Sequence, residues 1–297
     1  MKKRILAVLI ATALAVSVTG CAGNATSSSD STSASSVAES SDTSTQTSAD
    51  ASSEDESKDE SSQEESKDLE ANYTKYTLDG DLTQHMIDMS RLNEGNKVRL
   101  ANVIKKLKNG EEVTVGFIGG SITQGTSAGN DLCYAKLTAD WLQQTYSNAK
   151  INYVNAGIGA TGSYIGVHRV ENDLLSKKPD LVFVEFSVND TTENTERNKK
   201  SYDGLLRTIW KSSTNPAIIT IATTQEDGTS FQDQHAEIVK HYDLPMISYR
   251  NTILDTIKHG DIVWKDISDD NIHPNVPGHK IVSQLLQAYI SDVDKGV

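Results

Sequence analysis

The chain has 297 residues, and its 41 acidic residues against 28 basic ones give a net charge of −13. The first 70 residues hold 13 of the acidic and 5 of the basic residues, so residues 71–297 carry a net charge of only −5. This balance argues against a nucleic-acid partner, which would need clustered Lys and Arg. The two cysteines, Cys21 and Cys133, exclude a disulfide-rich framework.

The N-terminus has the pattern of a secretory signal. Three basic residues at positions 2–4 precede an apolar run over residues 5–18, which is too short to span a bilayer comfortably. The run ends in Val-Thr-Gly-Cys21, which resembles the lipobox of bacterial lipoproteins; an ordinary signal peptide with an incidental cysteine is the alternative. The resemblance implies a signal peptide over residues 1–20 and an extracytoplasmic protein. Two acyl chains on Cys21 would then anchor it to the membrane.

Residues 21–70 consist mainly of Ser, Thr, Ala, Asp and Glu, with almost no large apolar side chain. Such a segment cannot bury enough surface to offset its ordering entropy, so we expect a disordered tether. The folded domain is expected over residues 71–297, a length that is ample for one α/β domain.

Apolar strand-like and amphipathic helix-like segments alternate along this domain. After a mostly helical stretch over 86–108, strands are expected at 113–118, 151–155, 181–186, 217–222 and 245–248. Helices are expected at 132–146, 163–175, 202–211, 231–242, 249–258 and 277–291. This alternation predicts a flavodoxin-like three-layer α/β/α sandwich with a five-stranded parallel sheet. In such sheets function lies beyond the carboxyl ends of the strands.

The first strand is followed by Gly-Gly-Ser121-Ile-Thr-Gln-Gly. A phosphate-binding loop would need Lys where Thr126 stands, and the G-x-S-x-G turn of α/β hydrolases would need Gly where Thr123 stands. This stretch alone leaves Ser121 either a helix cap or a nucleophile. If Ser121 is the nucleophile, the glycines would leave room for a substrate carbonyl to approach the backbone.

The second strand is followed by Gly157, Gly159 and Gly162, which match the dinucleotide pattern G-x-G-x-x-G. That pattern needs an acid about 20 residues further on, at the end of the next strand. Glu185 lies 28 residues after Gly157 and inside the third strand, so the match is weak. The small residues could instead point backbone N–H groups at an oxyanion.

Polar residues also follow the third strand and precede the last helix. The Asn189 amide could donate to an oxyanion, although Asn-Asp is also common in turns and caps. Asp270 and His273 are three residues apart, so the carboxylate can accept from Nδ1 and leave Nε2 free to take a hydroxyl proton. As a metal pair they lack a clustered third ligand. Trp264, nine residues before His273, is a candidate substrate contact.

Together these segments resemble the four blocks of the SGNH/GDSL hydrolase superfamily, in order, over nearly all of residues 112–292. The resemblance implies that Ser121 is the nucleophile, His273 the general base and Asp270 the residue that orients it. It also implies an oxyanion hole made by the Ser121 and Ala160 N–H groups and the Asn189 side chain. Gly159 or Gly162 could replace Ala160 as donor if the Ala160 backbone is strained.

The sequence departs from the family in its first block, which reads GGSI instead of GDSL, and at Ser187, where the family usually has Gly. We expect an esterase for short acyl groups, most simply O-acetyl on a carbohydrate, that needs neither cofactor nor metal. The second block and the FVEFSVND segment resemble acetylxylan-esterase-like members of the superfamily. The alternative is a non-catalytic carbohydrate- or wall-binding lipoprotein on an esterase-like scaffold.

Overall fold

The computed structural model describes residues 73–191 and 195–296. The signal peptide expected at 1–20, the tether at 21–70 and the lipidation site Cys21 lie outside the described residues. Within the described part of the chain, no helix combines the length and the apolar character needed to cross a bilayer.

A six-stranded sheet in the order β1-β6-β5-β4-β2-β3 forms the centre of the fold. Its strands are β1 (Arg91–Asn93), β2 (Glu112–Gly119), β3 (Lys150–Gly157), β4 (Leu181–Glu185), β5 (Ala217–Ala222) and β6 (Met246–Ser248). Strands β2 to β6 run parallel, as predicted, whereas β1 pairs with β6 in the antiparallel direction.

The prediction of five strands is therefore corrected to six. The extra strand lies inside the stretch expected to be helical, between α2 (Gln84–Ser90) and α3 (Val98–Lys108). Gly95, with φ of 60°, lies in the connection that follows β1. A three-residue edge strand is too short to show a periodic pattern in the sequence.

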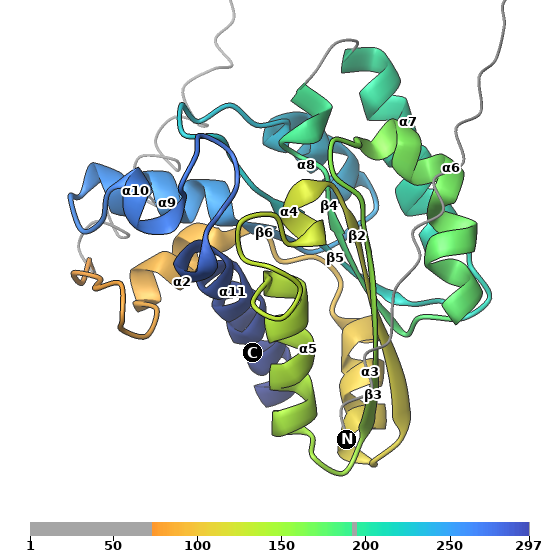
Figure 1. Ribbon diagram of the computed structural model, residues 1–297. Helices are drawn as coiled ribbons and strands as arrows, with labels where there is room; N and C mark the ends of the chain where they lie inside the picture. The colour runs from red at the N-terminus through yellow and green to blue at the C-terminus, as the bar shows by residue number, and fades with distance from the viewer. Residues whose placement is uncertain (1–72, 192–194, 297) are drawn as a thin grey trace, which may run out of the picture. The chain divides into compact units, whose positions relative to one another are not determined.

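Helices cover both faces of the sheet (Figure 1). One face packs against α3, α5 (Tyr134–Thr145), α9 (Tyr249–Lys258) and α11 (Val276–Lys295). The other face packs against α6 (Ser163–Asp173), α7 (Thr195–Trp210) and α8 (Gln232–His241). Successive strand residues alternate between the two layers, so Phe117 lies in the first core and Ile118 in the second. The structure thus confirms the three-layer α/β/α architecture.

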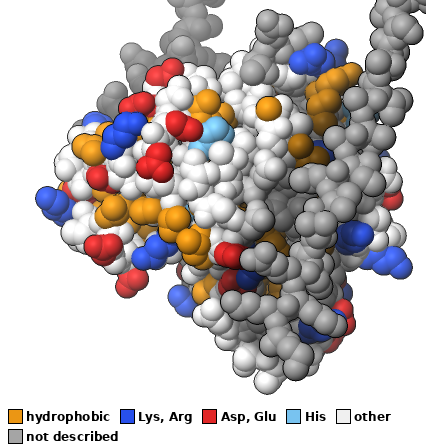
Figure 2. All heavy atoms as spheres, viewed as in Figure 1, with side chains coloured by type: hydrophobic (Ala, Val, Ile, Leu, Met, Phe, Trp, Pro, Cys, Tyr) orange, Lys and Arg blue, Asp and Glu red, His pale blue; other side chains and the backbone are white. Residues whose placement is uncertain are grey.

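The parallel strands end at one edge of the sheet, where the short helices α4 (Ser121–Gln124) and η2 (Asn189–Thr191) begin. Arg169 of α6 joins two of these ends, because its guanidinium donates to the carbonyl oxygens of Gly119 and Ala156 at 3.0 and 2.6 Å. On the face seen in Figure 2, acidic, basic and apolar side chains are interspersed.

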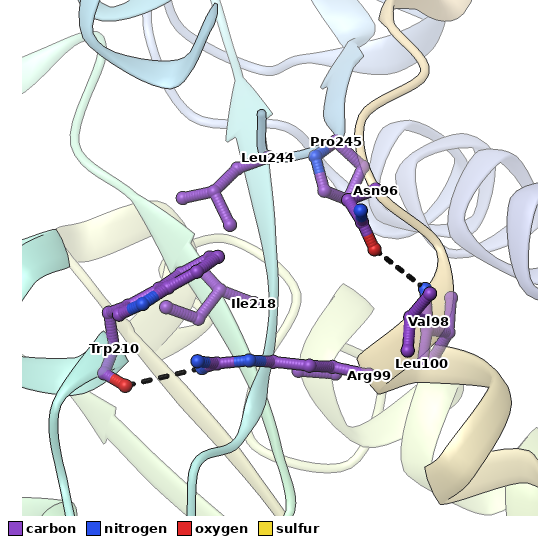
Figure 3. A pocket seen from close by; sticks show the side chains of 9 residues that line it. Asn96, Val98, Arg99, Leu100, Trp210, Ile218, Leu244 and Pro245 are labelled. Carbon is purple, nitrogen blue, oxygen red and sulfur yellow. Dashed lines mark hydrogen bonds between the residues drawn. The ribbon is translucent and has the colours of Figure 1, made fainter. Parts of the chain in front are cut away.

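A cavity of about 260 Å³ opens near the amino end of β5, away from this edge. Arg99 lies over the Trp210 ring, 3.8 Å from its centroid, and donates to the Trp210 carbonyl oxygen at 3.2 Å (Figure 3). A second bond from Arg99 to the Pro216 carbonyl oxygen fixes the guanidinium as part of the wall. Because function in parallel sheets gathers at the carboxyl ends, this cavity is not our candidate site.

Candidate active site

Ser121 is the first residue of α4, the single helical turn that follows β2. The first N–H groups of a helix have no partner inside that helix, so the Ser121 N–H is available to an acceptor. The turn closes at Gly125, whose φ of 101° lies in the left-handed region that favours glycine. The side chain of Ser121 is half-buried.

The glycines before Ser121 make room for the protein's own side chains. A Cβ on Gly119 would collide with the Thr123 side chain, and one on Gly120 would collide with the side-chain oxygen of Asn189. Room for a substrate carbonyl is therefore only part of the reason for these glycines. The lack of a side chain at Gly120 also lets Asn189, which follows β4, pack directly against the residue before the nucleophile.

The structure brings Ser121, His273 and Asp270 together in one chain of hydrogen bonds. The Ser121 Oγ lies 2.9 Å from the His273 Nε2, and the His273 Nδ1 lies 2.8 Å from the Asp270 Oδ2. With Nδ1–H donating to the carboxylate, Nε2 is the acceptor for the serine hydroxyl. The His273 and Asp270 side chains are 21% and 47% exposed, so this pair faces solvent.

The loop that carries this pair is rigidly held. Burial alone would raise the pKa of the Asp270 carboxyl, but bonds from the His273 side chain and from the N–H groups of His273 and Ile272 lower it to about 2. The Ser268 hydroxyl donates to the carbonyl oxygens of Asp270 and His273 at 2.8 and 2.6 Å. The hydrogen bonds from His273 and Ile272 thus favour the ionised form of the carboxylate.

Trp264 does not lie where a substrate contact would require. It begins the short helix α10 (Trp264–Ile267), is only 6% exposed and packs in the core. Its indole N–H donates to the Asp270 carbonyl oxygen at 2.6 Å. The expectation of substrate contact is corrected on this ground: a buried indole has no free face for a sugar, and Trp264 instead supports the Asp270 loop.

The glycine loop after β3 packs against α4. A Cβ on Gly157 would collide with the backbone of Gln124, and the Gly159 N–H donates to the Gln124 side-chain oxygen at 2.9 Å. The Gly157 N–H likewise donates to the Asn155 side chain at 2.9 Å. These amides are already used inside the protein, which argues against a pyrophosphate site.

Ala160 has a φ of 57° and is exposed. This left-handed conformation costs a non-glycine residue roughly 1 kcal/mol. Within residues 73–191 and 195–296 its N–H has no hydrogen-bond partner, whereas the Gly159 N–H is occupied by Gln124. Between these two, Ala160 is the better candidate for an oxyanion donor.

Asn189 and Asp190 form the third part of the site. Asp190 is buried, and its Oδ1 accepts from the Ser163 N–H at 2.8 Å, where α6 begins. Its Oδ2 lies 2.9 Å from the Nε2 of His235, a fully buried side chain on α8. Ser187 is also buried, and its Oγ accepts from the Thr223 N–H at 2.7 Å, so it ties two strand ends together.

A buried acid, to which the sequence assigned no role in the site, lies behind the nucleophile. Glu185, at the end of β4, is fully buried and accepts from the hydroxyls of Thr223 and Thr123 at 2.7 and 3.3 Å. Burial is the main reason why the pKa of its carboxyl is raised to about 7, although these bonds lower it. The signal was a lone carboxylate in an otherwise apolar strand, LVFVEF.

One cluster among the described residues could offer three ligand atoms to a metal ion. It consists of His85, Asp255 and His259, whose ligand atoms lie within 4.8 Å of one another. They already bond to each other, since the Asp255 Oδ2 lies 2.6 Å from the His85 Nε2 and 3.2 Å from the His259 Nδ1. None of the three belongs to the hydrogen-bond chain of Ser121, so the candidate chemistry does not involve them.

Several solved structures resemble this fold. A two-domain esterase (CEX) active on acetylated mannans is 38% identical, with a TM-score of 0.67, over 70% of this chain and 56% of that one. The same esterase co-crystallized with mannopentaose gives a TM-score of 0.68 over 57% of its length. The chain thus spans little more than half of these relatives.

A more distant likeness shows the fold alone. Axe2, an acetylxylan esterase from Geobacillus stearothermophilus, is 20% identical, with a TM-score of 0.51, over 60% of this chain and 94% of that one. No curated protein is significantly similar to the chain in sequence. The model of the GDSL-like lipase/acylhydrolase family matches residues 117–281, a span that includes Ser121, Asn189 and His273. The chain therefore belongs to the GDSL-like lipase/acylhydrolase family, the family that its sequence blocks indicated.

Proposed function

We propose that the protein is a serine esterase that removes short acyl groups, in particular O-acetyl groups, from carbohydrates. The observation that carries this proposal is the continuous hydrogen-bond chain Ser121–His273–Asp270, with distances of 2.9 and 2.8 Å. A serine hydroxyl bonded to an imidazole, which is itself oriented by a carboxylate, is the arrangement that activates a nucleophile.

In the first half of the reaction, the Ser121 Oγ attacks the ester carbonyl carbon while the His273 Nε2 takes the hydroxyl proton. The Asp270 carboxylate holds the imidazole in the required tautomer and stabilises the imidazolium that forms. His273 then gives this proton to the departing alcohol oxygen. The products at this stage are a free sugar hydroxyl and an acyl group on Ser121.

The negative oxygen of the tetrahedral intermediate needs hydrogen-bond donors that are already in place. We assign this role to the N–H groups of Ser121 and Ala160 and to the Asn189 side-chain amide. Two observations support the assignment: Asn189 contacts Gly120, and the Ala160 N–H has no partner among the residues that the structure describes. In the second half of the reaction, water loses a proton to His273 and attacks the acyl carbon. The bond from this carbon to the Ser121 Oγ then breaks, His273 returns the proton to Oγ, and the acid is released. This scheme uses no metal or cofactor.

The substrate class rests on the 38% identical relative. That esterase is active on acetylated mannans, so an acetylated polysaccharide or oligosaccharide is the substrate we propose here. The test is acetate release from acetylated mannan and acetylated xylan, with p-nitrophenyl acetate as a general ester. Turnover of p-nitrophenyl acetate without release from either polymer would keep the esterase and reject the carbohydrate. A fully inert protein would favour the non-catalytic binding role.

We further propose that the enzyme is attached to the outer surface of the cell membrane through lipidated Cys21. The basic and apolar N-terminus and the box ending at Cys21 support this location. Metabolic labelling with a fatty acid should mark the wild-type chain and not a Cys21→Ala variant. Labelling of both, or of neither, would reject the proposal.

A further inference from the structure

The buried carboxyl of Glu185 lies directly behind the nucleophile turn. Glu185 is the last residue of β4, and in the parallel register it stands beside Gly119 of β2 and Ile221 of β5. The other residues of β4 are Leu, Val, Phe and Val, and all are buried. Burying a carboxyl costs free energy unless hydrogen bonds compensate for the lost water. The hydrogen-bond partners of Glu185 therefore indicate its role.

Two hydroxyl groups donate to this carboxyl, and one of them belongs to the nucleophile turn. The Thr123 hydroxyl, two residues after Ser121, donates to Oε2 at 3.3 Å. The Thr223 hydroxyl comes from the end of β5 and donates to Oε1 at 2.7 Å. The backbone N–H of Gly120, the residue before Ser121, also lowers the pKa of the carboxyl.

A second set of bonds fixes the donors themselves. The Thr123 Oγ1 lies 2.7 Å from the Tyr134 hydroxyl of α5, and both side chains are fully buried. The Thr223 Oγ1 lies 3.1 Å from the Ser187 hydroxyl, two residues before Asn189. The carboxyl therefore stands at the centre of a network that reaches the nucleophile turn, the start of α5 and the strand that leads to Asn189.

The nucleophile turn needs an external support. Helix α4 has four residues and stands between Gly120 and Gly125. An isolated turn of this length is not stable by itself, and glycines on both sides add backbone freedom. The direction of the Ser121 N–H and Oγ must nevertheless be fixed closely, because a displacement of about 1 Å can cost roughly 100-fold in rate.

We infer that Glu185 is a positioning residue for Ser121, which it holds through the Thr123 hydroxyl of the nucleophile turn. This inference rests on the proposed esterase function. Ionised, the carboxyl accepts from both hydroxyl groups. A glutamine side chain offers one acceptor oxygen and would turn an NH₂ group toward at least one of these donors. The nucleophile turn should then lose its fixed orientation, while the groups that bind the substrate stay in place.

The test measures kcat and KM for p-nitrophenyl acetate, with the melting temperature, in the full chain. For Glu185→Gln we expect kcat to fall about 10- to 100-fold while KM changes less than threefold. Thr123→Val removes one donor from the turn and should lower kcat about tenfold. The matched control is Thr220→Val on β5, whose buried hydroxyl donates to the Pro245 carbonyl oxygen at 2.9 Å, away from the turn. It should lower the melting temperature and leave kcat unchanged.

A kcat within twofold of the wild type for Glu185→Gln overturns the inference. The same holds if Thr220→Val loses as much kcat as Glu185→Gln, because a general loss of stability then explains both. If Glu185→Gln does not fold, Thr123→Val decides, and an unchanged kcat overturns the inference. An inert wild-type protein is a different result, because it rejects the proposed function itself.

Discussion

Two Asp–His pairs near the candidate site have nearly the same separation and opposite surroundings. In the Asp270–His273 pair the two atoms are 2.8 Å apart and the side chains are 47% and 21% exposed. In the Asp190–His235 pair the atoms are 2.9 Å apart and the side chains are 1% and 0% exposed. In the exposed pair, the second ring nitrogen of His273 bonds to the Ser121 hydroxyl. In the buried pair, the second ring nitrogen of His235, Nδ1, has no hydrogen-bond partner in the described part of the chain.

The comparison shows that two features decide the role of an Asp–His pair: how deeply the pair is buried, and whether the second ring nitrogen contacts a nucleophile. Burial lowers the pKa of His235, although the hydrogen bond to Asp190 acts in the opposite direction. The ring also stacks on Tyr202, with centroids 3.5 Å apart. His235 is therefore a weaker base than an ordinary histidine, and its fully buried ring is not accessible to a substrate. The Asp190–His235 pair instead joins α8 to the start of α6 and to η2, which carries Asn189.

The largest effect that separates the pairs should follow from Asp270→Asn. The amide keeps the shape of the side chain but no longer fixes the imidazole tautomer, so we expect turnover to fall roughly 100- to 10,000-fold. The melting temperature should change by less than about 2 °C, because this pair is exposed. Turnover of p-nitrophenyl acetate and thermal unfolding measure both. Unchanged turnover would remove Asp270 from the mechanism.

The matching change in the buried pair, Asp190→Asn, should act mainly on stability. One amide oxygen cannot serve both the Ser163 N–H and the His235 Nε2–H, so one buried donor loses its acceptor. We expect the free energy of unfolding to fall by about 2 kcal/mol and the melting temperature by roughly 4–8 °C. Turnover of the folded fraction should drop less than tenfold. A loss of turnover as large as that of Asp270→Asn, with no loss of stability, would contradict the comparison.

The smallest effect concerns pH. Because the pKa of His235 in the folded protein is below its ordinary value of 6.5, the unfolded chain binds this proton more readily as the pH falls below 6.5. The stability contributed by the neutral ring is therefore full above pH 6.5 and declines in more acidic solution. Glu185 has the opposite effect on stability. Its pKa is raised from 4.5 to about 7, so its contribution to stability falls as the pH rises.

Comparing a His235 variant with the wild type at each pH separates the contribution of this histidine from that of the other titrating groups. The destabilisation caused by His235→Gln, measured by urea unfolding, should be largest at pH 8. It should be smaller at pH 5.5, since the wild type has then lost part of its own advantage. A difference that is constant from pH 8 to pH 5.5 would show that His235 does not titrate in this way.

The comparison also shows which parts of the molecule the sequence could predict. The five parallel strands follow from long apolar runs, and Ser121 was found because side chains at the ends of parallel strands gather at one edge of a sheet. Asp270 and His273 could be paired because they are three residues apart. The sequence could not pair Asp190 with His235, which are 45 residues apart on different elements.

Side-chain direction and burial account for the remaining errors. Glu185 was visible as an acid in a strand, but its contact with Thr123 depends on the register of β4 beside β2. Trp264 was expected in a loop near the substrate, yet its indole is buried and bonded to the loop of Asp270. The short edge strand β1 was hidden because three residues carry no periodic signal.

The central claim is that Ser121 is the nucleophile of an ester hydrolase. The direct measurement is hydrolysis of p-nitrophenyl acetate by the wild type and by Ser121→Ala, with mass spectrometry of both after exposure to an organophosphonate. The account predicts turnover and a single label on Ser121 in the wild type, and neither turnover nor label in Ser121→Ala, with an unchanged melting temperature. Full turnover by Ser121→Ala, or a label on another residue of an active wild type, would contradict it.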